Sequence, residues 1–143
     1  RVDNSVFVRT ATTGDALEVR RILDAALLEP GDVEGRINAG DVFIAGDRNG
    51  MSARAGDGER ILGTVVLEPL ERESGAHVGA VGVRRRHRDR GIGRALIETA
   101  LEREGLLTAR FDDGVRPFYE RLGFSIEPID EQRYRGTLTL DRV

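Results

Sequence analysis

The sequence contains no cysteine, no lysine and no tryptophan, so all 22 of its basic residues are arginine. Without cysteine the chain cannot form disulfides, thiolate metal sites or a cysteine acyl-enzyme. Its two histidines, His77 and His87, are too few for an ordinary zinc centre, and we expect no metal. Without lysine it cannot use Schiff-base chemistry or the phosphate-binding lysine of a P-loop. Any phosphate must therefore be bound by arginine or by backbone amides.

The length of 143 residues predicts one domain, residues 1–143, with a core that needs no disulfide or metal. A composition of 39% hydrophobic and 33% charged residues is typical of globular proteins. No apolar stretch approaches the roughly 20 residues of a membrane-spanning helix. A formal net charge of −3 does not indicate nucleic-acid binding, and no N-terminal signal pattern is visible. We expect a soluble cytoplasmic protein with no membrane or nucleic-acid partner.

Hydrophobic periodicity predicts strands and helices along the whole chain. The expected strands are Val6–Arg9, Val42–Ala45, Arg60–Glu68, Ala76–Val83, Leu106–Phe111, Phe124–Ile129 and Tyr134–Leu140, the last two as a hairpin. The first expected helix has apolar positions at Ala16, Val19, Ile22, Leu23, Ala26 and Leu27, and ends near Pro30. Further helices are expected over Asp32–Ala39, from Ile92 to Gly105, and around Val115, Phe118, Tyr119 and Leu122, the last capped by Asp112 or Asp113. Gly46–Glu59 is predicted to be a long mobile loop.

The most informative segment joins the strand that ends at Val83 to the helix that begins near Ile92. Six of the eleven residues from Arg84 to Arg94 are arginine, and Gly91 and Gly93 lie at the start of the helix. The first N–H groups of a helix have no intrahelical acceptor, and glycine lets a ligand approach the backbone, so this turn is a candidate anion site. The alternative is a solvated basic face, which the glycine pair argues against. A missing third glycine disfavours a Rossmann nucleotide site.

These residues resemble a known coenzyme A motif. Arg88, Gly91 and Gly93, with Val81 and Val83 on the preceding strand, match the pattern of the GCN5-related N-acetyltransferase (GNAT) superfamily. The resemblance implies a GNAT-like α/β fold, with a mixed, mostly antiparallel central sheet of about six to seven strands and about four flanking helices. It also implies that this sheet is splayed between its fourth and fifth strands.

Two further segments extend the resemblance over nearly the whole chain. Residues 118–124 resemble a second family signature, and Arg9, Ala11 and Asp15 echo the usual start of the first helix. One departure is Asp89, which stands where the family often has glycine and places a carboxylate near the expected pyrophosphate.

The resemblance implies that acetyl-CoA is the cosubstrate. The backbone amides of residues 89 to 94 would hold its pyrophosphate, and its pantetheine arm would run beside the strand ending at Val83, where a backbone N–H would polarise the thioester carbonyl. The cofactor-binding residues implied in this way are Val81, Val83, Arg84, Arg85, Arg86, Arg88, Asp89, Arg90, Gly91, Ile92, Gly93 and Arg94.

The implied activity is transfer of an acetyl group to a primary amine by direct attack, with both substrates bound together. Tyr119 occupies the family's position for the acid that protonates the leaving thiolate; the alternative is a core aromatic on an amphipathic helix. His77 is a candidate base for the incoming amine, with a half-exposed strand histidine as the alternative. Other candidates for the base are Glu68, Glu71, Glu73 and Asp112.

The acceptor is left open by the sequence. In the family it lies between the loop joining the first two helices and the final hairpin, here about Leu28–Glu34 and Ile129–Arg133. These loops carry Glu29, Asp32, Glu34, Asp130 and Glu131. One interpretation is an acidic cleft that attracts a cationic amine, and the alternative is a set of ordinary solvated carboxylates. Polyamine-like molecules, amino acids, peptide N-termini and protein lysines all fit. A homodimer through the C-terminal hairpin is possible on this pattern.

Two other functions compete with catalysis. One is a non-catalytic acyl-CoA-binding sensor or regulatory module. The other is a polyanion or RNA site at the arginine-rich turn, which the absence of aromatic residues for base stacking and the negative net charge disfavour.

Overall fold

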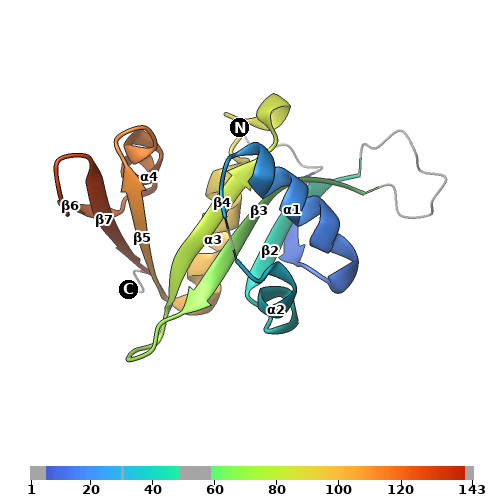
Figure 1. Cartoon of the computed structure of the whole chain (residues 1–143), viewed down its shortest axis with the longest axis horizontal. Coiled ribbons are helices and arrows are strands. Elements are labelled where there is room, and N and C mark those ends of the chain that lie inside the picture. Colours follow the sequence, from blue (N-terminus) through green and yellow to red (C-terminus); the bar gives the residue numbers. More distant parts are fainter. Residues whose placement is uncertain (1–5, 30, 49–58, 141–143) are drawn as a thin grey trace.

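The computed structural model describes residues 6–29, 31–48 and 59–140. In these residues seven strands form one sheet in the order β1-β2-β3-β4-β5-β7-β6 (Figure 1). The strands are β1 Val6–Thr10, β2 Val42–Asp47, β3 Arg60–Pro69, β4 Ala76–Val83, β5 Leu106–Asp112, β6 Ser125–Pro128 and β7 Arg133–Thr139. The helices are α1 Ala16–Ala25, α2 Val33–Asn38, α3 Ile92–Glu104 and α4 Arg116–Leu122, with short 3-10 helices η1 Thr13–Asp15 and η3 Arg85–His87.

The pairing between β4 and β5 is short and parallel, whereas every other pair of neighbouring strands is antiparallel. Only Ala76 and His77 of β4 pair with β5, opposite Leu107 and Thr108. Beyond these residues the two strands diverge, and Figure 1 shows them as the arms of a V. The expected mixed sheet with a splay between its fourth and fifth strands is confirmed.

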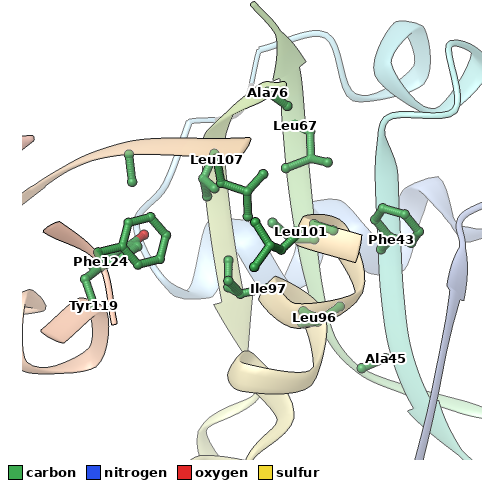
Figure 2. Close-up of a cluster of buried hydrophobic side chains, with 14 of the residues drawn as sticks. Phe43, Ala45, Leu67, Ala76, Leu96, Ile97, Leu101, Leu107, Tyr119 and Phe124 are labelled. Atoms are coloured by element: carbon green, nitrogen blue, oxygen red, sulfur yellow. The ribbon is translucent and has the colours of Figure 1, made fainter. Parts of the chain in front are cut away.

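Helices cover both faces of the first four strands. One buried cluster joins α1 and α2 to the sheet through residues such as Val19, Leu23 and Val66. The other joins α3 and α4 to the opposite face and includes Leu67, Leu96, Leu107 and Tyr119 (Figure 2). β3 is buried over Leu62–Leu67, as its continuous apolar run predicts for a strand covered on both faces.

The first helix is shorter than its apolar pattern predicts. α1 ends at Ala25, and Leu27 has a φ of 60° and is 91% exposed, so the expected apolar position at Leu27 is wrong. A capping box of Thr12 and Asp15 begins the 3-10 helix η1, which leads directly into α1.

The expected carboxylate cap of α4 is also wrong. Val115 occupies the N-cap position of this helix, and Asp112 Oδ1 instead accepts a hydrogen bond from Gly114 N at 2.9 Å. Of the predicted loop Gly46–Glu59, Gly46 and Asp47 continue β2, and residues 49–58 lie outside the described residues.

Candidate cofactor and acyl-transfer site

The turn between β4 and α3 presents a row of free backbone donors. Asp89 and Gly91 have φ angles of 65° and 82°, in the left-handed region, and α3 begins at Ile92. Among the described residues, no acceptor is bonded to the N–H groups of residues 89 to 94, and the first helical bond runs from Ala95 N to Gly91 O at 2.9 Å. Six consecutive N–H groups at a helix N-terminus make a site for an anion.

Gly93 lets this turn pack closely against α4. A Cβ atom at Gly93 would come within 3.0 Å of Phe118 Cε1, so a larger residue would displace the aromatic ring. Phe118 precedes Tyr119, and their rings make an edge contact with centroids 5.0 Å apart. The start of α3 is therefore held in contact with the helix that carries Tyr119.

The arginines of the turn divide into two groups. Within the described part of the chain, no carboxylate lies within salt-bridge distance of Arg85, Arg86, Arg88 or Arg90. Arg88 Nε donates to Val83 O at 3.1 Å, which folds its side chain back along the turn. These four side chains add uncompensated positive charge around the free amides.

The other two arginines of the segment are already bonded to protein groups. Arg84 donates from Nε to Ile61 O at 2.6 Å and forms an ion pair with Glu18. Arg94 bonds Glu98 Oε2 at 3.3 Å and Arg121 O at 2.8 Å. The structure thus gathers residues 85 to 93 at one candidate anion site and directs the side chains of Arg84 and Arg94 elsewhere.

The space between the diverging strands β4 and β5, here called the gap, is faced by the backbone of β4 at Val81 and Val83. Arg84 N donates to Leu62 O of β3 at 2.8 Å. Successive residues of a strand direct their backbone groups to opposite edges, so Val83 and Val81 direct theirs away from β3 and toward the gap. β5 has already diverged there, and although Val83 O accepts from Arg88 Nε, the N–H groups of Val81 and Val83 have no partner in the described residues and can bond a ligand lying along β4.

Tyr119 lies in an aromatic cluster on the α3 side of the sheet. Its ring stacks on Phe111 with centroids 4.2 Å apart and makes an edge contact with Phe124 at 5.1 Å. Figure 2 shows Tyr119 and Phe124 on the opposite side of Ile97 and Leu101 from Phe43 and Ala45. Burial raises the pKa of Tyr119 to about 12, so the phenol stays protonated at neutral pH.

His77 lies at the closed end of the gap, on the opposite face from Tyr119. Its neighbours Ala76 and Val78 belong to the cluster that contains Tyr119, so the alternation of β4 directs His77 to the other face. His77 Nδ1 is 2.8 Å from Thr108 Oγ1 on β5. Desolvation lowers the pKa of His77, and the charges of Arg110 and Arg135 lower it further against the opposing effect of Glu68.

Among the other candidates for the base, only Glu68 lies beside His77. The two residues are opposite each other in the β3–β4 register, and a Cβ on Gly79 would meet Glu68 Oε2 at 2.8 Å. Asp112 is engaged by the backbone of Gly114, and Glu71 and Glu73 are exposed in the β3–β4 connection. Sequence reasoning missed Thr108, although the alternation of buried residues in β5 places it on the same face as His77.

Several carboxylates of the expected acceptor loops have structural partners. Asp32 caps α2 by accepting from Gly35 N at 3.0 Å, and Glu34 forms an ion pair with Arg20. Asp130 Oδ1 accepts from the backbone N–H groups of Gln132 and Arg133. Three of the five acidic residues therefore stabilise their own segments.

Two hollows lie near the turn. One of about 250 Å³ lies between α1 and the turn and is lined by residues that include Ile22, Val83, Arg85 and Arg88. A larger one of about 690 Å³ lies at the start of α1 and β3, but its charged lining residues Arg9, Asp15, Glu18, Glu59, Arg60 and Arg84 bond one another or a neighbouring strand. Of these two hollows, only the smaller one adjoins the free amides and unpaired arginines of the turn, which marks the turn as the candidate site.

Comparison with known proteins gives a family and a fold. A family model described as an acetyltransferase (GNAT) domain matches residues 39–126, more than half of the chain. A GNAT-family acetyltransferase from Bacillus cereus has a TM-score of 0.75 at 15% identity, over 96% of this chain and 99% of that one. NAA60 of Arabidopsis thaliana in complex with acetyl-CoA has a TM-score of 0.75 at 17% identity, over 94% and 99%.

A third similar structure is part of a longer protein. N-acetylglutamate synthase of Neisseria gonorrhoeae, complexed with coenzyme A and L-arginine, has a TM-score of 0.74 at 15% identity, over 96% of this chain and 34% of that one. The comparison with curated protein sequences gives no match. Within the described residues, no helix has the length and apolar character needed to cross a membrane.

Proposed function

The chain belongs to the GNAT acetyltransferase family, and we propose that it transfers an acetyl group from acetyl-CoA to a primary amine by direct attack in a ternary complex. The observation that carries this proposal is the row of six unbonded N–H groups at residues 89 to 94, surrounded by arginines without carboxylate partners. A pyrophosphate offers the acceptor oxygens and negative charge that such a row requires.

The cosubstrate would lie along β4. With its pyrophosphate at the turn, its pantetheine arm would enter the gap where Val83 and Val81 present free backbone N–H groups. An N–H directed at the thioester oxygen stabilises the negative charge that develops there during attack. Arg85, Arg86, Arg88 and Arg90 would neutralise the phosphates.

The reaction moves three protons. The amine nitrogen attacks the thioester carbon, the carbon–sulfur bond breaks, and the sulfur leaves as a thiolate. We assign the first proton, from the Tyr119 hydroxyl, to this thiolate. The nitrogen loses the third proton once it is bonded to the acetyl carbon, and this proton restores the hydroxyl of Tyr119. The burial that raises the pKa of Tyr119 would also raise the pKa of a thiol beside it, and this favours transfer of the proton to the thiolate.

The second proton is the one that the incoming amine must lose before attack. We assign its removal to His77, which desolvation keeps neutral at physiological pH. Val81 lies four positions after His77, roughly 13 Å along an extended strand. The proton of the amine would therefore reach His77 through water or through the acceptor itself. An acid and a base on opposite faces of the sheet fit a reaction in which the two substrates meet inside the gap.

Calorimetric titration separates the enzyme from the competing functions. Acetyl-CoA is expected to bind at tens of micromolar or tighter, and a short oligonucleotide is not expected to bind. Failure to bind acetyl-CoA would exclude both the acetyltransferase and the acyl-CoA sensor. If acetyl-CoA binds but no amine tested causes release of the free thiol of coenzyme A, the acyl-CoA sensor remains as the function.

Tyr119→Phe tests the assignment of the acid. The variant keeps the aromatic packing and loses the hydroxyl, so we expect kcat to fall by about 10²-fold or more while acetyl-CoA binding is unchanged. Phe118→Leu, on the same helix, is the control for altered packing. A Tyr119→Phe enzyme with full kcat across the pH range would remove Tyr119 from this role.

A further inference from the structure

The C-terminal part of the sheet has one face that no described helix covers. Along β5, Leu107, Ala109 and Phe111 are buried on the α3 side, whereas Arg110 and Asp112 are exposed on the other. β7 shows the same alternation, and the exposed face of β5, β7 and β6 adjoins the gap at Thr108 and His77.

Arg110 and Arg135 lie directly opposite each other on this face. They are register partners in the antiparallel β5–β7 pair, and both are exposed. Side chains at such positions have Cβ atoms about 5 Å apart, and like charges placed there repel. A pair of this kind lowers stability unless an anion lies between the two groups.

No carboxylate of the described residues neutralises the pair. Neither arginine has an acidic oxygen within 4 Å, although Glu127 faces Arg135 across the β6–β7 register. Apart from these two, the described arginines without a carboxylate partner are the four of the turn, together with the separate side chains of Arg72 and Arg121. The part of the chain that the structure describes therefore has two places where unpaired arginines gather.

The second place lies next to the reacting groups. β5 runs parallel to β4 with Thr108 beside His77, and Arg110 lies two residues beyond Thr108 on the same face of β5, where the two strands diverge. The guanidinium charges of Arg110 and Arg135 are felt at the His77 ring, as is the opposing carboxylate charge of Glu68. An anion on this pair would thus lie on the same face of the sheet as His77, the residue proposed to deprotonate the amine.

We propose that Arg110 and Arg135 together bind a carboxylate of the acceptor, which is therefore a small amino-acid-like molecule whose amine and carboxylate are close together. This proposal rests on the proposed acetyltransferase function and narrows its substrate class. Guanidinium groups present paired N–H donors that match the two oxygens of a carboxylate. Most acidic groups of the acceptor loops are already engaged, which argues against a site built for a purely cationic polyamine.

The first test compares each of the common free amino acids with its carboxamide in the acetyl-CoA thiol-release assay. The pair shares the amine and side chain and differs in the carboxylate. We expect the best acid to exceed its amide in kcat/KM by about 10- to 100-fold. Equal or better use of the amide would overturn the carboxylate site while leaving the acetyltransferase intact, whereas acetylation of no amine at all would overturn the proposed function itself.

The second test uses Arg110→Gln and Arg135→Gln. Each should reduce the ratio of acid to amide kcat/KM by about 10-fold or more and leave the KM for acetyl-CoA unchanged. Arg133→Gln is the matched control, because Arg133 is exposed on the same strand and face but pairs with Asp130. Thermal midpoints at or above that of the unmodified protein are expected, since repulsion is removed.

A binding measurement tests the carboxylate site without requiring catalytic turnover. The acetylated product of the best amino acid should bind the coenzyme A complex at least 10-fold more tightly than its carboxamide in calorimetry, and Arg135→Gln should abolish the difference. Unchanged discrimination in both arginine variants would show that the carboxylate, if preferred, is bound elsewhere, and would overturn the proposal.

Discussion

Arginine has opposite roles in two neighbouring regions of this protein. Around the start of α1, Arg9 forms a two-pronged ion pair with Asp15, with N–O distances of 2.8 and 3.2 Å, and also bonds Glu59 at 3.0 Å. Arg60 pairs with Asp47 in the same region. In the β4–α3 turn, Arg85, Arg86, Arg88 and Arg90 have no carboxylate partner among the described residues.

The difference distinguishes structural charge from charge available to a ligand. In the first region the carboxylates are partly buried and already neutralise the arginines, so a ligand would have to break existing ion pairs. In the turn, free amides and unpaired arginines combine into a positive potential that a bound anion would neutralise. Arg84 marks the boundary, because it belongs to the turn in sequence and to the ion-paired region in structure.

The largest effect is expected from removing charge at the turn. Arg88→Gln with Arg90→Gln should weaken acetyl-CoA binding by about 10²-fold, since each charge-assisted bond to phosphate contributes about 1.5–3 kcal/mol. Both side chains are exposed, so the free energy of unfolding should be unchanged. Calorimetry and urea unfolding measure the two quantities.

The matched control is Arg20→Gln with Arg133→Gln, which removes the same charge at two exposed, ion-paired positions. Its acetyl-CoA affinity should stay within about twofold, because surface ion pairs contribute little and lie outside the turn. Equal weakening by both double variants would mean that net charge, and not the turn, attracts the cosubstrate.

The next effect is on stability. Arg9→Gln leaves Asp15, whose side chain is 12% exposed, without its main partner, and we expect a loss of about 1–3 kcal/mol in the free energy of unfolding. Acetyl-CoA affinity should be unaffected. The Arg9→Gln, Asp15→Asn double variant should recover part of the loss, and full stability of the single variant would refute a structural role for this pair.

The helices and strands were predictable because local signals in the sequence set their limits: glycine and proline mark their ends, and hydrophobic periodicity marks their type. The strand Ala76–Val83 has the predicted limits, and Gly105 ends α3 with a φ of 79°. The partners of charged residues were not predictable, because they come from distant parts of the chain: Glu18 and Arg84 are 66 residues apart, and Arg9 and Glu59 are 50 apart.

The candidate site was predictable to the same extent. The motif Arg88, Gly91 and Gly93 locates the turn, and the structure adds which arginines are free. Strand alternation alone places Arg110 and Arg135 on exposed faces, but only the register of β5 with β7 brings them together. Leu27 fits the helical period in sequence, yet the chain has already left the helix by that residue.

Lowering the pH should weaken the contribution of the Arg9–Asp15 ion pair to stability, whereas the turn has no such pair to lose. Desolvation raises the pKa of Asp15, but the bonds from Arg9 and Thr12 outweigh it, so the net pKa is below its ordinary value. The pair therefore stabilises the fold fully above pH 4 or so, and this contribution is lost as pH falls below the ordinary value of about 3.9. In urea unfolding followed from pH 5 downward, Arg9→Gln should show a shallower pH dependence than the unmodified protein. An identical slope would assign the acid sensitivity to other carboxylates.

The smallest effect is expected at Asp89, where the two roles of charge meet in one residue. It is exposed, has a φ of 65°, and forms no ion pair with a described arginine, so its carboxylate would face the pyrophosphate unneutralised. Asp89→Asn keeps a side chain that tolerates the left-handed region and removes the charge. Loss of a repulsion of about 0.5–1 kcal/mol should tighten acetyl-CoA binding about two- to fivefold without changing stability. Asp89→Gly should tighten acetyl-CoA binding to a similar extent and also relieve the backbone strain at this position. A rise in the free energy of unfolding seen for Asp89→Gly but not for Asp89→Asn therefore measures that strain. Weaker binding by Asp89→Asn would show that the carboxylate orients the turn, and that the family's glycine is not equivalent to it here.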